Sequence, residues 1–191
     1  MPTLLFITHP EVVVNPDIPI ERWHLSASGT DRMRAFSRSP TTSNVRAIWS
    51  STETKAIEAA GILAGALGQG VRVSKDLGEN DRSATGFLPP AEFESVADAF
   101  FANPNSSVRG WERAIDAQAR VQRAVLEIVA EHTEGDLAIV AHGAVGTLLF
   151  CSFSGNAIDR SFDQPFQGHY WKAALSNLKP ENGWVSIAPR V

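Results

Sequence analysis

The fold of this chain is decided by the stretch Leu4-Leu5-Phe6-Ile7-Thr8-His9-Pro10-Glu11. A short apolar run that ends abruptly at a breaker is typical of a strand in a sheet that is covered on both faces. Ligands of such sheets bind beyond the carboxyl ends of the strands, and His9 lies at such an end. We therefore expect His9 to stand at a ligand-binding edge.

The same pattern recurs late in the chain, where the apolar run Asp136–Ala141 leads into His142-Gly143. Two strands that each end in a histidine can bring both imidazoles to one edge of one sheet. One imidazole could then attack an electrophile while the other stabilises charge. For either histidine alone, the ordinary alternative is a hydrogen-bonded side chain at a strand end. Because both histidines follow an apolar run, we favour a functional pair.

With these two motifs the chain resembles the histidine phosphatase superfamily, also described as phosphoglycerate mutase-like. Members of that family open with Arg-His-Gly-Glu at the end of the first strand and carry a second His-Gly after a late strand. The corresponding motifs here are Thr8-His9-Pro10-Glu11 and His142-Gly143. The resemblance implies an α/β fold, a three-layer α/β/α sandwich with a mostly parallel central sheet. It also implies a single domain, residues 1–191, with a variable insertion at about residues 82–110.

The resemblance implies a metal-independent phosphatase that acts on a small phosphorylated molecule without a cofactor. His9 is the expected nucleophile, since a neutral imidazole can attack phosphorus and form a phosphohistidine. His142 and Gly143 are expected to stabilise the phosphoryl oxygens. Glu79 is the expected acid that protonates the leaving oxygen, with Asp81 as the alternate.

Three further residues are expected to contact the phosphate: Thr8, Asn15 and Lys55. Asn15 lies six residues after His9, where the family often has an asparagine, although an asparagine before a proline is also ordinary turn chemistry. Lys55 falls where the family has an arginine, at the start of a helix whose N-terminus favours anions. An exposed surface lysine is the alternative for that position.

Departures from the family pattern bear on activity. Thr8 and Lys55 replace arginines, whose planar forks bind phosphate through two parallel hydrogen bonds. Pro10 replaces glycine and removes a backbone N–H. A lost charge-assisted hydrogen bond to a desolvated anion costs about 1.5–3 kcal/mol. The alternative function is therefore a catalytically weakened or inactive phospho-ligand-binding protein on the same fold. Arg22 and Arg82 are candidates for a compensating cation.

Composition narrows the class of protein. A chain of 191 residues, 43% of them apolar, is expected to form one compact domain. The net charge of −4 gives no basic surface for nucleic acid, and no run of about 20 apolar residues predicts a membrane span. A single cysteine, Cys151, excludes an internal disulfide and is expected in the core. With no basic leader before the first strand, a cytoplasmic protein is expected, and a homodimer stays open.

Periodicity and breakers predict the other elements. Helices are expected over residues 26–37, 53–67, 91–101 and 111–132 and after Gly143, and strands over residues 45–50, 71–73, 169–175 and 184–187, the last two as a hairpin. We expect Arg32, Arg34 and Arg38 to form a solvated face of the first helix. A metal hydrolase using His9, His24, His142 and His169 is disfavoured because their spacing fits no metal motif. A serine hydrolase is disfavoured because Gly-x-Ser-x-Gly does not occur.

Overall fold

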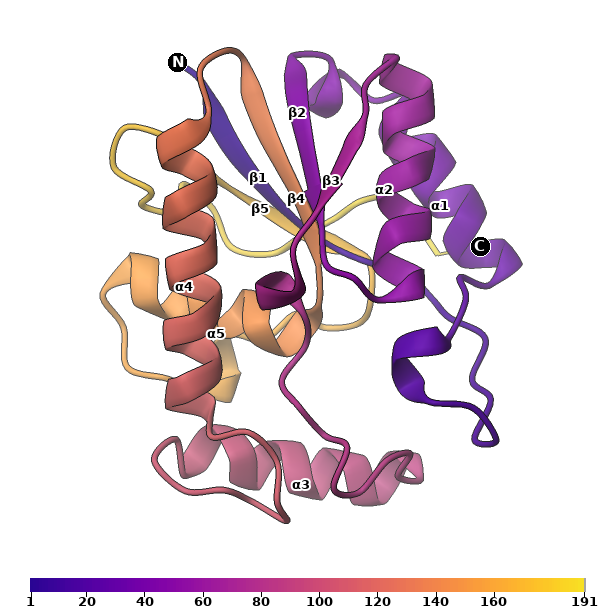
Figure 1. The fold of residues 1–191 in the computed structure, drawn as a ribbon, viewed down its shortest axis with the longest axis vertical. Helices are drawn as coiled ribbons and strands as arrows, with labels where there is room; N and C mark the ends of the chain where they lie inside the picture. The colour runs from indigo at the N-terminus through magenta and orange to yellow at the C-terminus, as the bar shows by residue number, and fades with distance from the viewer. Residues whose placement is uncertain (191) are drawn as a thin grey trace.

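A six-stranded sheet forms the middle of the molecule in the computed structural model, which describes residues 1–190 (Figure 1). Its strands are β1 (Thr3–Thr8), β2 (Val45–Ser50), β3 (Val71–Val73), β4 (Asp136–Ala141), β5 (His169–Ala174) and β6 (Val185–Ser186). The order across the sheet is β3-β2-β4-β1-β5-β6. Strands β1 to β4 are parallel, whereas β5 is antiparallel to β1 and β6 is antiparallel to β5. The predicted mostly parallel sheet and the C-terminal hairpin are therefore confirmed.

Helices cover both faces of the sheet and form the outer layers of the predicted sandwich (Figure 1). Their bounds are α1 (Ala27–Ser37), α2 (Thr54–Leu67), α3 (Pro90–Ala102), α4 (Ala114–Glu131) and α5 (Gly143–Ser154). Helices α1 and α2 pack on one face and α4 and α5 on the other, while α3 lies beyond the strands at the lower end of the view. Single 3-10 turns lie in the connections at Ile20–Arg22, Pro40–Thr42, Lys75–Leu77 and Arg160–Phe162.

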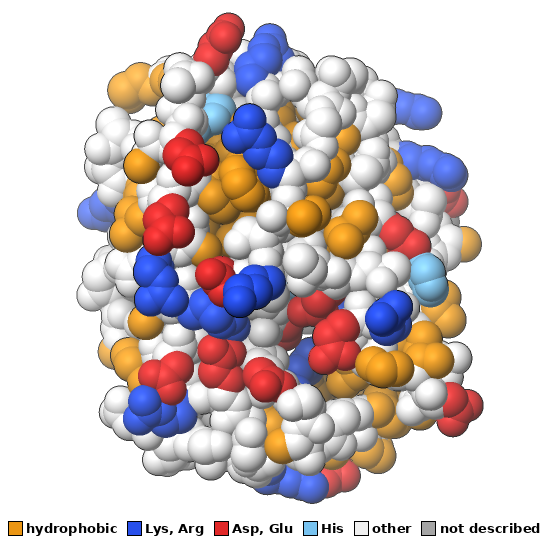
Figure 2. Space-filling model, viewed as in Figure 1, with side chains coloured by type: hydrophobic (Ala, Val, Ile, Leu, Met, Phe, Trp, Pro, Cys, Tyr) orange, Lys and Arg blue, Asp and Glu red, His pale blue; other side chains and the backbone are white. Residues whose placement is uncertain are grey.

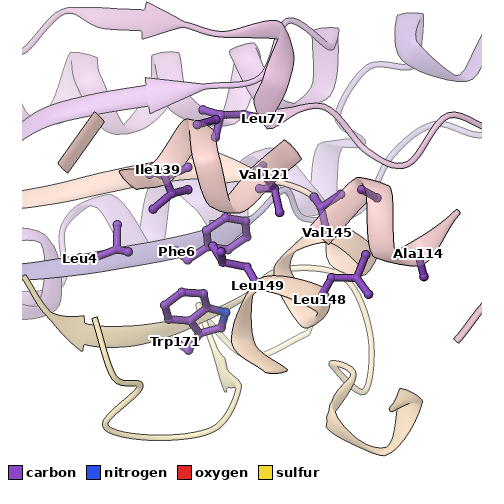
Figure 3. Close-up of a cluster of buried hydrophobic side chains, with 14 of the residues drawn as sticks. Leu4, Phe6, Leu77, Ala114, Val121, Ile139, Val145, Leu148, Leu149 and Trp171 are labelled. Atoms are coloured by element: carbon purple, nitrogen blue, oxygen red, sulfur yellow. The ribbon is translucent and has the colours of Figure 1, made fainter. Parts of the chain in front are cut away.

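Strand β1 is buried on both faces, which explains its continuous apolar sequence. Leu4 and Phe6 point into the core under α4 and α5, whereas Leu5 and Ile7 point into the core under α1 and α2. All four are fully buried, and each such side chain contributes about 1.5–3 kcal/mol through burial. Figure 3 shows Phe6 beside Trp171 of β5. The centroids of their rings are 5.2 Å apart, and the rings are nearly parallel.

Short connections bring the functional segments to one edge of the sheet. Strand β2 passes into α2 through Ser51–Glu53, and β4 passes into α5 through His142 alone. Because β1, β2 and β4 are parallel neighbours, their carboxyl ends lie together at that edge. The sequence pattern therefore places His9, the N-terminus of α2 and the N-terminus of α5 around one point.

The prediction that Arg32 lies on a solvated face of the first helix is wrong. Its side chain is almost completely buried, and its guanidinium donates to both oxygens of Glu11 at 2.8 Å. It also donates to backbone oxygens of the C-terminal segment, those of Gln167, Gly168 and Ala188. These acceptors lie more than 130 residues away in the chain, so no local pattern in α1 reveals them.

Other expectations about burial hold. Arg34 and Arg38 are exposed, and Cys151 is buried, as predicted. Helix α4 begins at Ala114, three residues later than predicted.

Within residues 1–190, no helix combines the length and the apolar character that crossing a membrane requires.

Candidate functional site

The two histidines lie together, as the matched strand ends predicted. His9 follows β1 and His142 follows β4, and the backbone N–H of His9 donates to the carbonyl of Ala141 at 3.1 Å. The centroids of the two imidazole rings are 5.3 Å apart, with 67° between the ring planes. His9 is 7% exposed and His142 is fully buried. The pair is thus held at the carboxyl edge of the sheet by two adjacent strands.

The hydrogen bonding of His9 fixes its reactive nitrogen. Its Nδ1 lies 2.9 Å from the carbonyl oxygen of Pro10. A carbonyl only accepts, so Nδ1 carries the proton and the lone pair is on Nε2. Burial, with the positive charge of Lys55 adding to it, lowers the pKa of His9 to about 4. His9 is therefore neutral at pH 7, the state in which an imidazole is a nucleophile.

His142 makes its polar contacts through Nε2. That atom lies 2.7 Å from the hydroxyl oxygen of Ser51 and 3.2 Å from Oε1 of Glu53. Its Nδ1 is buried and has no hydrogen-bond partner among residues 1–190. Burial lowers the pKa of His142 well below its ordinary value, and the carboxylate of Glu53 opposes that shift. An anion near Nδ1 would give the imidazolium a partner that the protein does not supply.

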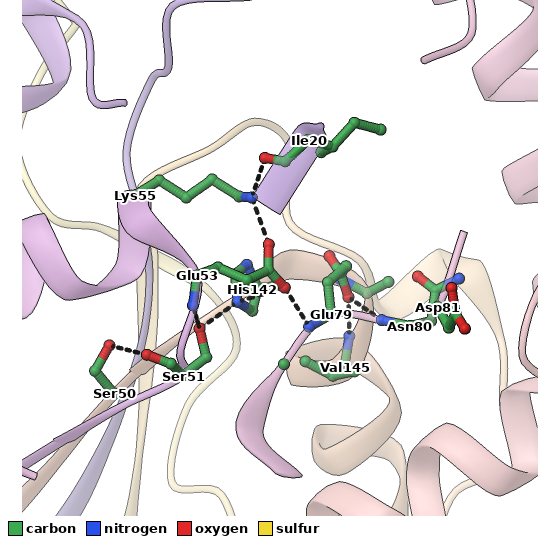
Figure 4. A network of polar contacts seen from close by, with 12 residues as sticks. Ile20, Ser50, Ser51, Glu53, Lys55, Glu79, Asn80, Asp81, His142 and Val145 are labelled. Atoms are coloured by element: carbon green, nitrogen blue, oxygen red, sulfur yellow. Dashed lines mark hydrogen bonds and ion pairs between the residues drawn. The ribbon is translucent and has the colours of Figure 1, made fainter. Parts of the chain in front are cut away.

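Glu53 lies at the centre of a polar network that sequence reasoning missed (Figure 4). Its Oε2 is 2.5 Å from Nζ of Lys55, and its Oε1 accepts the backbone N–H of Glu79 at 2.9 Å. Burial alone would raise the pKa of the Glu53 carboxyl, but His142 and Lys55 beside it lower that pKa to about 2. Glu53 is therefore ionised at neutral pH. The available sequence signal was an acid two residues before the lysine at the start of α2.

Lys55 lies in the site but is already bonded there. Its side chain is only 4% exposed, so it is not the surface lysine of the alternative prediction. Besides the carboxylate of Glu53, its ammonium contacts the carbonyl oxygen of Ile20 at 2.9 Å. The positive charge that the resemblance assigns to phosphate is thus neutralised within the protein.

Glu79 caps the start of α5 with its carboxyl group. Its two oxygens accept the backbone N–H groups of Ala144 and Val145 at 3.2 and 3.1 Å (Figure 4). Burial raises the pKa of Glu79, and the positive charge of Arg82 partly opposes this rise. A raised pKa keeps more of the carboxyl protonated near neutral pH, which suits a general acid. Asp81, the alternate, is exposed and uses its carboxylate on the N–H of Ser83.

A cavity of about 330 Å³ adjoins this network. It is lined by Pro19, Ile20, Glu21, Glu53, Glu79, Asn80, Asp81, Arg82, Ser83 and Gly86. Figure 2 shows acidic and basic side chains side by side around a hollow in the lower half of the molecule. Neither His9 nor His142 is among the described residues that line this cavity, and His142 lies one side chain behind it, in contact with Glu53. Glu53 thus lies between the imidazole of His142 and this cavity.

Of three other predicted phosphate contacts, two bind elsewhere in the protein and the third, Gly143, lies close to Gln164. Thr8 is completely buried, and its hydroxyl donates to Oε1 of Gln164 at 2.6 Å while accepting the N–H of His169. Asn15 uses its side-chain oxygen to accept the N–H of Asp17, which is the turn chemistry of the alternative prediction. Gly143 begins α5, and a side chain added there would collide with Gln164. Gln164, which no motif singles out, thus contacts both Thr8 and the start of α5 at the strand ends.

The remaining candidates lie outside the site. Glu11 pairs with Arg32, and Arg22 is exposed and does not line the cavity. His24 is exposed and pairs with Glu58. Within residues 1–190, no group of three or more histidine, cysteine, aspartate or glutamate side chains is arranged to hold a metal ion.

Comparison with known proteins agrees with this geometry. The sequence model of the histidine phosphatase superfamily, branch 1, matches residues 6–186. No curated protein matches the sequence. Among solved structures, a mycobacterial glucosyl-3-phosphoglycerate phosphatase is 17% identical, with a TM-score of 0.81 over 97% of this chain and 99% of that one. YhfR of Bacillus stearothermophilus is 22% identical, with a TM-score of 0.81 over 98% and 99% of the two chains.

A third solved structure is the phosphoserine phosphatase of Entamoeba histolytica in complex with 3-phosphoglyceric acid. It is 14% identical, with a TM-score of 0.77 over 97% of this chain and 98% of that one. At these identities the likeness establishes the fold, and the fold is the predicted one.

Proposed function

Because the chain belongs to branch 1 of the histidine phosphatase superfamily, we propose that it hydrolyses a small phosphomonoester through a phosphohistidine on His9. The observation that carries this proposal is the buried imidazole pair, with the lone pair of His9 on Nε2 and His142 beside it. The proposed substrate is a phosphorylated small molecule, the class named in the titles of solved neighbours. The proposed setting is the cytoplasm.

The first half-reaction transfers the phosphoryl group to the protein. Nε2 of His9 attacks phosphorus, and the bond between phosphorus and the ester oxygen breaks. Glu79 donates its proton to the departing oxygen, which its raised pKa allows. His142 stabilises the phosphoryl oxygens as they gain charge, and Glu53 at its Nε2 favours the imidazolium form that does so.

The second half-reaction returns the site to its starting state. Glu79, now ionised, takes a proton from water as the water oxygen attacks phosphorus. The bond between phosphorus and Nε2 of His9 breaks, and inorganic phosphate leaves. These steps assign no role to a metal ion or a cofactor, since the nucleophile, the acid and the charge-stabilising donors are all side chains.

A second candidate function is the binding of a phosphorylated ligand without turnover. The observation that favours it is the ion pair between Glu53 and Lys55, which neutralises a cation at the site and places a carboxylate near the imidazoles. The buried hydroxyl of Thr8 adds to it, because no arginine fork is present there. This candidate predicts that phosphate binds and that no phosphohistidine forms.

Hydrolysis of p-nitrophenyl phosphate by the full-length protein, with and without EDTA, tests the proposal. We expect turnover that EDTA leaves unchanged and that His9→Ala abolishes. His24→Ala is the matched control, because His24 is exposed, pairs with Glu58 and does not line the cavity. Absence of turnover across a panel of phosphomonoesters, or full activity in His9→Ala, would overturn the proposal.

A further inference from the structure

The site as described lacks a free cation for a phosphoryl group. The ammonium of Lys55 is bonded to Glu53 and to the carbonyl of Ile20, and Thr8 offers no charge. A phosphomonoester carries about two negative charges near neutral pH. Binding it beside the Glu53 carboxylate therefore requires positive charge from another residue.

Arg82 is placed to supply that charge. It lies three residues after Glu79 and lines the same cavity as Glu53 and Glu79. Its guanidinium carbon lies 5.2 Å from the ring centroid of Phe93 and 5.6 Å from that of Trp111. Among residues 1–190, no carboxylate lies within ion-pair distance of Arg82, and its side chain donates no hydrogen bond. Its five N–H donors are thus left for a ligand.

The segment predicted as an insertion holds Arg82 in place. The carbonyl of Arg82 accepts the N–H groups of Thr85 and Gly86, and the indole N–H of Trp111 donates to the hydroxyl of Thr85 at 2.9 Å. Cation–π contact with two rings restrains the guanidinium without neutralising its charge. The segment therefore positions a cation at the cavity.

The two ends of the same segment are tied together beside Glu79. The N–H of Glu112 donates to the carbonyl of Asp81 at 2.9 Å, and the N–H of Asp81 donates to Oε2 of Glu112 at 3.1 Å. Arg120 of α4 then bonds both Glu112 and the carbonyl of Glu79. The loop that carries the proposed acid and the segment that carries Arg82 are thus one connected unit.

The charge of Arg82 reaches the groups that would react. Burial is the main cause of the lowered pKa of His9 and of the lowered pKa of His142, and the positive charge of Arg82 adds to both shifts. The same charge opposes the upward shift that burial gives the pKa of Glu79. An anion bound at Arg82 therefore lies within electrostatic reach of all three groups.

We propose that Arg82 binds the phosphoryl group of the substrate and takes the place of the arginine that the family carries at the position of Thr8. This assignment rests on the proposed function. A guanidinium matches phosphate oxygens with two parallel hydrogen bonds, which an ammonium cannot do. The segment predicted as an insertion would then contribute a cation to a phosphate site whose other residues follow the strands.

Calorimetric titration of the full-length protein with inorganic phosphate tests this assignment without requiring turnover. We expect Arg82→Ala to weaken phosphate binding by about 10- to 100-fold, the usual effect of a charge-assisted hydrogen bond. Arg82→Lys, which keeps the charge and loses the fork, should weaken it less. Guanidinium ion added to Arg82→Ala should restore part of the affinity.

Arg72→Ala is the matched control, because Arg72 also lies over a tryptophan ring, that of Trp49 at 5.7 Å, and does not line the cavity. It should bind phosphate as the wild type does. Equal affinity in wild type and Arg82→Lys, with Arg82→Ala folded and equally tight, would overturn the assignment. Should Arg82→Ala not fold, unchanged affinity in Arg82→Lys together with unchanged turnover would overturn it.

The outcomes separate this assignment from the proposed function. Turnover of p-nitrophenyl phosphate that neither Arg82→Ala nor Arg82→Lys changes would refute the role of Arg82 and support the phosphatase activity. Phosphate binding that depends on Arg82, without any turnover, would refute the phosphatase activity and support the role of Arg82.

Discussion

Glu53→Gln is the most informative single substitution, because the carboxylate of Glu53 stands where the anion-binding groups converge. It lies 2.5 Å from the ammonium of Lys55 and 3.2 Å from Nε2 of His142. Glutamine keeps the size of the side chain and one oxygen acceptor for the N–H of Glu79. The substitution therefore removes the negative charge and the oxygen that holds the ammonium of Lys55.

The expected size of the effect follows from Coulomb's law. A phosphoryl oxygen bonded to Lys55 would share that ammonium with the Glu53 carboxylate. At an effective dielectric constant of about 20, two like charges roughly 5 Å apart on either side of a shared cation repel by about 3 kcal/mol. The loss of the carboxylate also frees Lys55 to bind phosphate. Allowing for screening and relaxation, we expect the Kd for inorganic phosphate to fall by at least about tenfold.

Calorimetric titration with inorganic phosphate measures this change directly. Glu58→Gln is the matched control, because Glu58 is also on α2, pairs with the exposed His24, and does not line the cavity. The Kd of Glu58→Gln for inorganic phosphate should equal that of the wild type. A rise of the Kd in Glu53→Gln would refute the reasoning, since Glu53 would then help to assemble the phosphate site rather than compete with the anion.

Three further substitutions test other parts of the account. Glu79→Gln should lower kcat by about 10²- to 10⁴-fold in steady-state assays because it removes the general acid, whereas Asp81→Asn should leave kcat unchanged. In urea titrations, the wild type should lose stability as the pH falls from 6.5 to 4, because unfolded His9 binds a proton there and folded His9, with its pKa lowered to about 4, does not. That shift corresponds to roughly 3 kcal/mol at most, so His9→Asn should show a smaller loss. Arg32→Met should lower the free energy of unfolding by about 3–5 kcal/mol because it leaves buried partners unpaired, whereas the exposed Arg34→Ala should change it by less than about 0.5 kcal/mol.

The sheet and the histidine pair were predictable because their signals are local. The strands β1 and β4 are apolar runs with clear ends, and a buried parallel strand needs no information from distant residues to be recognised. That both runs end in a histidine, His9 and His142, was then enough to predict that the two side chains meet. Periodicity and breakers predicted the remaining elements, and the resemblance implied their three-layer arrangement.

The contacts of the polar side chains were not predictable, because they depend on residues far apart in the chain. Thr8 is closed off by Gln164, more than 150 residues later, and Arg32 is enclosed by the C-terminal segment. Glu53 looked like an ordinary residue at a helix start, and only its position beside Lys55 and His142 reveals an ion pair inside the site. Spacing in the sequence carries no such information.

The claim that His9 is the nucleophile is tested most directly by trapping its phosphoryl adduct. The full-length protein is mixed with p-nitrophenyl phosphate, quenched rapidly in alkali, in which phosphohistidine survives, and digested for peptide mass spectrometry. The account predicts a phosphoryl group on His9 that acid removes, and none in His9→Ala. Turnover that proceeds with no adduct, or with the phosphoryl group on another residue, would contradict it.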